Sequence, residues 1–267
     1  MRFLCFRLFA PLASFGDVAV GERRPSLSAP TRSMVLGLVG ACLGIRRDEE
    51  DGQTALERDL GVATRTDAEG SLLVDYHTAQ APDEPRIRAF RRRRGRLPAT
   101  RREELSCTTD AKGVPVELGT QLSQRQYRVD AVFAVALWVR EEDSTWSLER
   151  IQEALVRPVF VPYAGRRSAA IAMPFQPRLV EADDPVAALR GVQFPLDEEL
   201  GALLDPKRRG PVQTVQRIYR WERQTKGKEW NVTPDRTEAR RDQVVSRTRW
   251  QFNQRDEHVL VERIEKE

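Results

Sequence analysis

The stretch VDAVFAVALWV, residues 129–139, constrains the fold of this chain more than any other segment. After Asp130 it is apolar at both odd and even positions, which is typical of a strand buried on both faces in the middle of a sheet. The start of the chain also predicts a buried strand, since apolar side chains alternate between the two faces from Phe3 to Leu8. Arg7 interrupts this stretch, so we do not expect it to be the apolar part of a signal peptide.

The remaining apolar patterns extend these strands into an α+β fold. We expect strands at 2–9, 62–66, 129–139 and 170–180, helices at 33–45 and 147–156, and a further apolar run at 71–78. The β-α-β-β-α-β order predicts a ferredoxin-like or RRM-like domain over residues 1–182, with a long insertion at 79–128 before its third strand. Residues 183–267 are expected to form a smaller, β-rich C-terminal domain.

The helix expected at 33–45 begins with groups suited to binding phosphate. Thr31 and Ser33 are both good N-cap residues. Free amides, the positive end of the helix dipole and Arg32 converge at the same place. A phosphate site is one interpretation, and a capped core helix with an incidental arginine is the other.

Three glycines form a stripe along one face of this helix, at Gly37, Gly40 and Gly44. Glycine costs up to about 1 kcal/mol in a helix interior, so the stripe predicts close backbone packing, with a sheet as the expected neighbour. The uncharged run from Met34 to Ile45 is shorter than the roughly 20 residues that a membrane-spanning helix needs. We therefore expect no membrane association.

The positive charge of the chain is concentrated in one segment. The net charge is +4, yet residues 85–102 alone contain nine arginines and no acid. A local basic surface is expected where a protein meets phosphates, although a solvated or disordered basic loop would have the same composition. Only five of the 44 basic residues are lysines. Arginine suits phosphates and bases, but a GC-rich genome would give the same bias.

The segment RPVFVPYAGRRSAA, residues 157–170, predicts a tight turn with a basic tip. Two prolines set an extended path, Gly165 permits the turn, and two arginines and a serine follow at 166–168. Adjacent arginines on a strand would point in opposite directions, so a turn is needed to bring both to one ligand. Tyr163 offers a face on which a base could stack.

The chain contains few groups that could act as catalysts. Its two histidines, His77 and His258, lack metal-ligand spacing, and no Walker loop, G-x-S-x-G or G-x-G-x-x-G motif is present. His77 lies beside Asp75 and Tyr76, a cluster that could move protons to cleave RNA, but roles in binding or structure are also open. The nearest lysine in sequence is Lys112. The three cysteines lack metal spacing and are expected to be reduced thiols in a cytosolic protein.

Six segments of the chain together resemble the Cas-five family, a subunit family of the type I-E CRISPR surveillance complex, Cascade. In order they are RLFAPLASFGD, PTRSMVLGLVGACLGIRRDEE, LLVDYHT, VFAVALWV, ALVRPVFVPYAGRRSAAIAMPF and QFNQRDEHVLV. The resemblance covers residues 1–78 and 121–183, and more weakly 246–261. Family members often have Gln-Ala-Trp-Gly where this chain has Ala-Ser-Phe-Gly at 13–16, and residues 184–245 match nothing in the family.

The resemblance implies a non-catalytic RNA-binding subunit that acts in antiviral defence in the cytoplasm, without metal or cofactor. Such a subunit binds the 5′ handle of CRISPR RNA, caps a filament of CasC subunits and contacts the large CasA subunit. It meets target DNA indirectly, as part of the complex. The insertion at 79–128 would be a thumb hairpin.

The resemblance also implies two sets of binding residues. The residues expected to bind RNA are Thr31, Arg32, Ser33, Tyr76, His77, Thr78, Tyr163, Gly165, Arg166, Arg167 and Ser168. The thumb residues expected to contact nucleic acid are Arg86, Arg88, Arg91, Arg92, Arg93, Arg94 and Arg96.

Two other functions stay open at this point. A metal-independent endoribonuclease that processes CRISPR repeat RNA is the first, because relatives in another CRISPR subtype cut RNA with tyrosine, lysine and histidine. Against it, no lysine stands next to His77 in this chain. A free-standing protein that binds RNA or DNA without a preferred sequence is the second.

Overall fold

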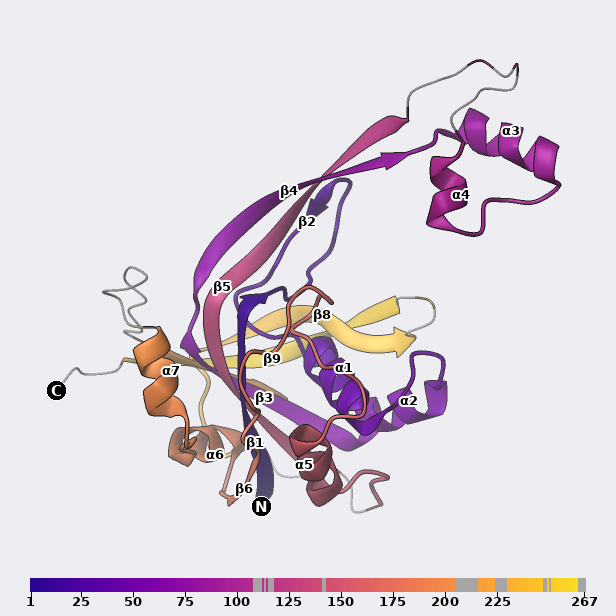
Figure 1. Ribbon diagram of the computed structural model, residues 1–267. Coiled ribbons are helices and arrows are strands. Elements are labelled where there is room, and N and C mark those ends of the chain that lie inside the picture. The colour runs from indigo at the N-terminus through magenta and orange to yellow at the C-terminus, as the bar shows by residue number, and fades with distance from the viewer. Residues whose placement is uncertain are drawn as a thin grey trace. The chain divides into compact units, whose positions relative to one another are not determined.

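The chain folds into a mixed α/β structure built on a large, mainly antiparallel sheet (Figure 1). The computed structural model describes residues 1–107, 112, 114, 118–140, 143–204, 216–223, 230–246, 249 and 251–263. Its elements are β1 (Arg2–Ala13), β2 (Arg23–Arg24), α1 (Arg32–Leu43), α2 (Glu50–Asp59), β3 (Leu60–Ala68), β4 (Ser71–Ala81), α3 (Glu84–Arg94), α4 (Arg101–Leu105), β5 (Gly119–Val139), α5 (Leu148–Val156), β6 (Arg178–Glu181), α6 (Pro185–Gly191), α7 (Asp197–Leu203), β7 (Gln216–Glu222), β8 (Arg236–Ser246) and β9 (Gln251–Arg263).

The chain divides into two compact units. Unit 1 comprises residues 1–18, 25–73 and 126–267, and unit 2 comprises residues 19–24 and 74–125. In unit 1 the strand order is β6-β1-β5-β3-β7-β9-β8. Strands β2 and β4 pair with β5. Residues 119–125 of β5 belong to unit 2, and residues 126–139 belong to unit 1.

Strand β5 is central in unit 1, as the apolar run at 129–139 predicts. It pairs antiparallel with β1 on one side and with β3 on the other. Phe133, Val135 and Leu137 belong to one hydrophobic core, and Ala134 and Trp138 to a second. The prediction of a strand buried on both faces is therefore confirmed.

Helices cover both faces of this part of the sheet. Helices α1 and α5 pack on each other over the face of β1 that carries Leu4 and Phe6 (Figure 1). Helix α6 lies against β1, β3 and β7, over the core that contains Phe3 and Cys5. Arg7, which interrupts the apolar start of the chain, is buried and pairs with Asp67 and Asp197. All three cysteines are buried and free.

The C-terminal strands join the same sheet. Residues 183–267 do contain strands at two of the expected places, β7 and β9. However, β7 pairs with β3 through residues 63–66, so no sheet boundary falls near residue 182. The pairing joins residues more than 150 positions apart in the chain, which a local sequence pattern does not report.

Two helical segments differ from the sequence expectation. No helix or strand was expected in the charged segment 46–59, but most of it forms α2, which buries only Leu56 and Asp59. The insertion was expected to be a hairpin, yet it carries α3 and α4 between β4 and β5. N-capping explains α3 and α4, because the side chains of Asp83 and Thr100 accept hydrogen bonds from backbone amides in the first turns of these helices.

One glycine of the stripe in α1, Gly40, faces another helix rather than the sheet. A Cβ atom at Gly40 would lie 3.2 Å from Cδ1 of Leu56 in α2. Gly44 ends α1 with a φ of 81°, a left-handed conformation that glycine adopts without strain. The expectation that the stripe faces a sheet was wrong at Gly40, because α2 was not foreseen. Among the described residues, no helix is both long and apolar enough to cross a membrane.

We expect Gly40→Leu to lower the free energy of unfolding by about 1–3 kcal/mol, because the new side chain would overlap Leu56 and Gln53. Urea denaturation followed by tryptophan fluorescence measures the change. Gly201→Leu in α7 is the matched control, because a Cβ atom there meets nothing within 4 Å. Equal stability of the two variants would contradict the close approach of α1 and α2.

Candidate nucleic-acid interface

The turn after Tyr163 is clamped to the end of β1. The amide of Ser14 donates to the carbonyl of Ala164 (3.0 Å), and the amide of Ala164 donates to the carbonyl of Ala169 (2.8 Å). Gly165 has a φ of 87°, and a Cβ atom there would lie 1.7 Å from the carbonyl oxygen of Ser14. Only glycine fits this position, so the tight turn predicted around Gly165 is confirmed.

Gln126 holds three segments together beneath this turn. Its carbonyl oxygen accepts hydrogen bonds from Oγ of Ser14 and from Nη1 of Arg166, each at 3.3 Å. Its side-chain Oε1 accepts from the amide of Ser26 (3.1 Å). The turn, the end of β1 and the segment around Ser26 are thereby fixed to β5. Gln126 was not predicted from the sequence, because nothing in its own neighbourhood marks it.

The two arginines of the turn have different surroundings. The guanidinium of Arg166 lies over the ring of Tyr127, with 4.6 Å between Cζ and the ring centroid, and is half-buried. Tyr127 is itself buried, so the cation–π contact fixes the orientation of Arg166. Arg167 and Ser168 are exposed. A phosphate group at this turn would meet one oriented and one adaptable guanidinium.

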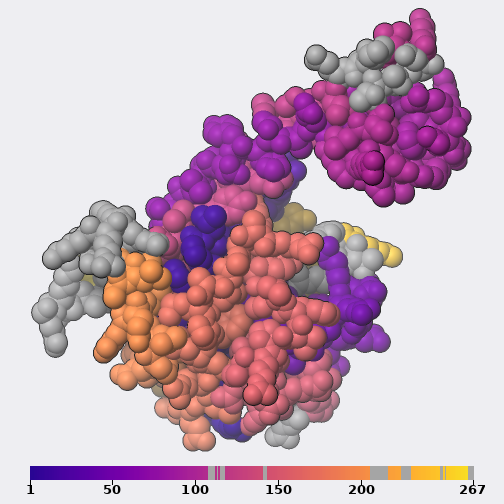
Figure 2. Space-filling model, viewed as in Figure 1, coloured from indigo at the N-terminus to yellow at the C-terminus, as the bar shows by residue number. Residues whose placement is uncertain are grey.

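The turn belongs to an extended surface of unit 1. Figure 2 shows the chain between β5 and β6, in pink to salmon, spread over the face of this unit that is turned to the viewer. Tyr163 is 39% exposed, so part of its ring is open to a stacking partner. Tyr163 forms a β-bridge with Ala170, which closes the turn at its base. The turn thus combines an aromatic side chain, two guanidiniums and a hydroxyl on a rigid backbone.

The front of α1 is occupied by the protein itself. Thr31 is the N-cap and accepts from the amide of Met34, and its hydroxyl lies 3.2 Å from that of Ser33. Arg32 is only 3% exposed. Its backbone amide donates to Asp242 of β8 (2.6 Å), so a carboxylate already meets the positive end of the helix. A phosphate would have to displace that carboxylate.

The guanidinium of Arg32 is also bound by carboxylates and backbone carbonyls. Its Nε donates to Oε1 of Glu222 in β7 (2.8 Å), and it forms an ion pair with Glu57. Its Nη2 donates to the carbonyls of Glu57 (2.7 Å) and Leu60 (3.0 Å). Burial lowers the pKa of Arg32 to about 10, and the guanidinium keeps its charge at neutral pH. The structure therefore places Arg32 inside the fold and not at a surface that RNA could reach.

The side chains of the DYHT cluster lie on an exposed strand of unit 2. Tyr76 is 70% exposed, and its hydroxyl accepts from Nε2 of Gln124 (3.2 Å). Successive side chains of a strand point to opposite faces, so Tyr76 and His77 are separated, while Thr78 shares the face of Tyr76. This arrangement does not bring a tyrosine and a histidine together for proton transfer. Among the described residues, no three His, Cys, Asp or Glu side chains could hold a metal ion.

The seven thumb arginines expected to contact nucleic acid fall into three groups. Arg88 pairs with Glu84 and Arg96 with Glu103, both on the surface. Arg96 and the amide of Ala99 lower the pKa of Glu103 to about 2. Arg86 is buried and lies 3.6 Å from Asp83, so its side chain is not offered to a ligand.

The third group is the last turn of α3, Arg91–Arg94. All four of these residues are exposed, and none forms a hydrogen bond or ion pair with another described side chain. Gly95 ends the helix in the left-handed conformation, with a φ of 71°. Four guanidiniums are therefore grouped within one helical turn, which is an arrangement suited to phosphates.

Comparison with known proteins identifies the family to which this chain belongs. Residues 3–256 match the model of the CRISPR-associated protein family Cas5, and the chain belongs to this family. It is 31% identical over 195 residues to "CRISPR system Cascade subunit CasD" of Escherichia coli (strain K12). The aligned residues cover 70% of this chain and 75% of that protein. The family recognised from the sequence motifs is confirmed.

Two solved structures share the fold. A chain of a "CRISPR RNA-guided surveillance complex" has a TM-score of 0.55 and 24% identity, covering 99% of this chain and 91% of its own. A "Crystal structure of Cas protein" has a TM-score of 0.50 and 23% identity, covering 98% and 94%. At this level of identity the two matches establish the mixed α/β fold.

Proposed function

We propose that this chain is a non-catalytic, CRISPR RNA-binding subunit of a type I-E Cascade complex in the cytoplasm. In this role it binds the 5′ handle of the RNA, caps a filament of CasC subunits and contacts CasA. The observation that supports RNA binding most is the turn at 163–168, where Arg166 is oriented on Tyr127 beside the exposed Arg167. The match to CasD supports the assignment to Cascade.

The test is co-purification from cells that express the chain with CasA, CasC and a CRISPR repeat–spacer transcript. We expect the chain to carry processed CRISPR RNA and both subunits, and to lose the RNA when the repeat-derived 5′ handle is deleted. Equal recovery of RNA with and without the handle would contradict handle binding. A defined cleavage product from purified chain and repeat RNA in EDTA would favour the endoribonuclease alternative, which the separation of Tyr76 and His77 disfavours.

We also propose that β1, α1, β3, β5, α5 and β6 form a ferredoxin-like core, to which residues 79–128 are attached as a thumb. The order of the four strands, β6-β1-β5-β3, and their antiparallel pairing support this assignment. The location of α1 and α5 on one face supports it as well. In this description β7, β8 and β9 extend the core sheet beyond β3.

We expect the four arginines Arg91–Arg94 to bind target DNA rather than the RNA handle. Replacing all four with alanine should leave RNA-bound complexes intact and weaken capture of duplex DNA. Each lost phosphate contact should lower the slope of log affinity against log salt concentration by about 0.9. DNA binding by the assembled complex across a salt series measures this slope.

The paired arginines of the same segment provide the control. Arg88→Ala and Arg96→Ala remove charges that already have carboxylate partners, so we expect a smaller change in slope. An unchanged slope in the fourfold variant, or loss of the RNA from the complex, would refute the proposal that these arginines bind target DNA and not the RNA handle.

A further inference from the structure

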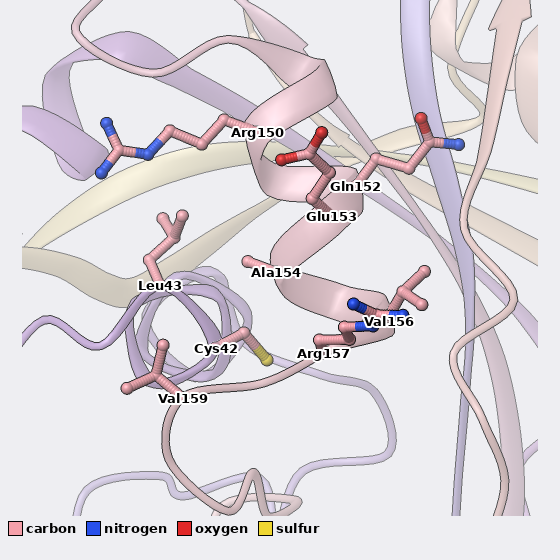
Figure 3. A pocket seen from close by; sticks show the side chains of 9 residues that line it. All are labelled: Cys42, Leu43, Arg150, Gln152, Glu153, Ala154, Val156, Arg157 and Val159. Atoms are coloured by element: carbon pink, nitrogen blue, oxygen red, sulfur yellow. The ribbon is translucent and has the colours of Figure 1, made fainter.

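A groove lies between the C-terminal end of α1 and helix α5 (Figure 3). Its volume is about 730 Å³, which is large enough to take several side chains. It is lined by Cys42, Leu43, Arg150, Gln152, Glu153, Ala154, Val156, Arg157 and Val159. None of these residues belongs to the basic turn.

The chain that closes the groove is held in place by α1. The amide of Val159 donates to the carbonyl of Cys42 (2.9 Å), and the amide of Phe160 donates to that of Ala41 (3.1 Å). These carbonyls belong to the last turn of α1, and that of Ala41 also accepts from the amide of Gly44 (3.1 Å). Gly44 leaves room for the segment, because a Cβ atom there would lie 2.9 Å from Cγ1 of Val159. The segment therefore has a fixed shape without any partner.

This fixed segment presents apolar side chains to solvent. Val156 is 63% exposed, Val159 66%, Phe160 40% and Val161 83%. Single exposed apolar residues are common, but four within six positions of an ordered segment are typical of a protein–protein contact. Leu43 and Ala154 add apolar surface inside the groove.

The ends of the groove carry positive charge. Arg150 lies over the ring of Trp146, with 4.8 Å between Cζ and the ring centroid, so its position is fixed. Arg157 is exposed, and its side chain forms no hydrogen bond or ion pair with another described residue. The two are seven residues apart, roughly 10 Å along a helix axis. Glu153 is the one acid among the lining residues, so the groove has a cationic excess.

We propose that this groove docks an apolar segment of another protein subunit, flanked by carboxylates that meet Arg150 and Arg157. Nucleic acid fits it poorly, because its floor offers apolar surface where a sugar–phosphate backbone needs donors. A protein segment with two or three apolar residues between acids satisfies the floor and both ends. The inference rests on the proposed function, since it requires that the chain works in an assembly.

The test uses the assembled complex with the photo-crosslinker benzoylphenylalanine in place of Val156, on the exposed rim of the groove. We expect crosslinks to a single peptide of CasA or CasC in which apolar residues stand next to Asp or Glu. Benzoylphenylalanine in place of Val245, which is 55% exposed on β8, is the control and should not label that peptide. Arg157→Glu should reduce the crosslink at least tenfold, and Arg157→Lys should retain most of it.

Other results would overturn the proposal. A crosslink to RNA, a crosslink to a second copy of this chain, or an intact complex without any crosslinked subunit would each refute the groove as a docking site while leaving RNA binding in place. A crosslink in the Arg157→Glu variant as strong as with Arg157 in place would refute the proposed pairing of Arg157 with a carboxylate of the partner. Failure of the wild-type chain to assemble at all would instead refute the proposed function, and this inference with it.

Discussion

Replacing Arg32 with alanine is expected to lower the free energy of unfolding by about 3–5 kcal/mol. The guanidinium is buried and joined to Glu57 and Glu222, and it donates to two backbone carbonyls as well. Its removal breaks the ion pair with Glu57 and takes a donor from the two carbonyls and from Glu222, which keeps the amide of Val62 and the guanidinium of Arg140. The loss of these buried interactions costs far more than the loss of a surface pair. Urea denaturation should show a lower midpoint with an unchanged slope.

The control for this prediction is Arg46→Ala. Arg46 follows the same helix and is exposed, so its replacement should change stability by no more than about 0.5 kcal/mol. The alternative role for Arg32, contact with an RNA phosphate, makes the opposite prediction. Normal stability of Arg32→Ala together with weaker RNA binding would restore the front of α1 as a phosphate site.

Replacing Arg166 and Arg167 together with alanine is expected to weaken assembly on CRISPR RNA by about a hundredfold or more. Each well-shielded, charge-assisted contact contributes about 1.5–3 kcal/mol, and about 1.4 kcal/mol corresponds to a tenfold change in affinity. The fold should persist, because the hydrogen bonds that close the turn join backbone atoms of Ser14, Ala164 and Ala169. The measurement is the amount of RNA that co-purifies with the chain and CasC.

Single variants separate the two arginines. Arg166→Lys keeps the charge but loses the planar group that lies over Tyr127, so we expect it to bind RNA clearly more weakly than wild type. Arg167→Lys should retain most of the affinity, because an exposed phosphate contact requires mainly charge. Arg178→Ala, which removes an exposed arginine from β6, is the control. Normal RNA recovery by the double variant would show that the handle site lies elsewhere.

Local patterns predicted the elements whose burial is regular. The apolar run at 129–139 identified the central strand, and Ser147 with its following apolar residues identified α5 within one residue. Helix α2 was missed because it buries only Leu56 and Asp59, too few for a periodic signal. Helix α3 was missed for the same reason, since its buried face includes an arginine, Arg86.

The candidate site was predictable only where its geometry is local. The glycine and the two arginines of the turn are adjacent in sequence, so their grouping was visible. Their supports, Gln126 and Tyr127, lie about 40 residues earlier and carry no motif. The sequence left two interpretations open at the front of α1 for the same reason, because Glu222 and Asp242, which contact Arg32, stand 190 and 210 positions later in the chain.

These long separations also affect the order in which the protein can fold during its synthesis. A ribosome adds about 5–20 residues per second, so roughly 10–40 seconds pass between the emergence of Arg32 and that of Glu222 and Asp242. Throughout this interval the cation has no carboxylate partner from β7 or β8, and the edge of β3 that later pairs with β7 is open. An open strand edge is a site of aggregation. We therefore expect the nascent chain to be most prone to aggregation before its last fifth has been made.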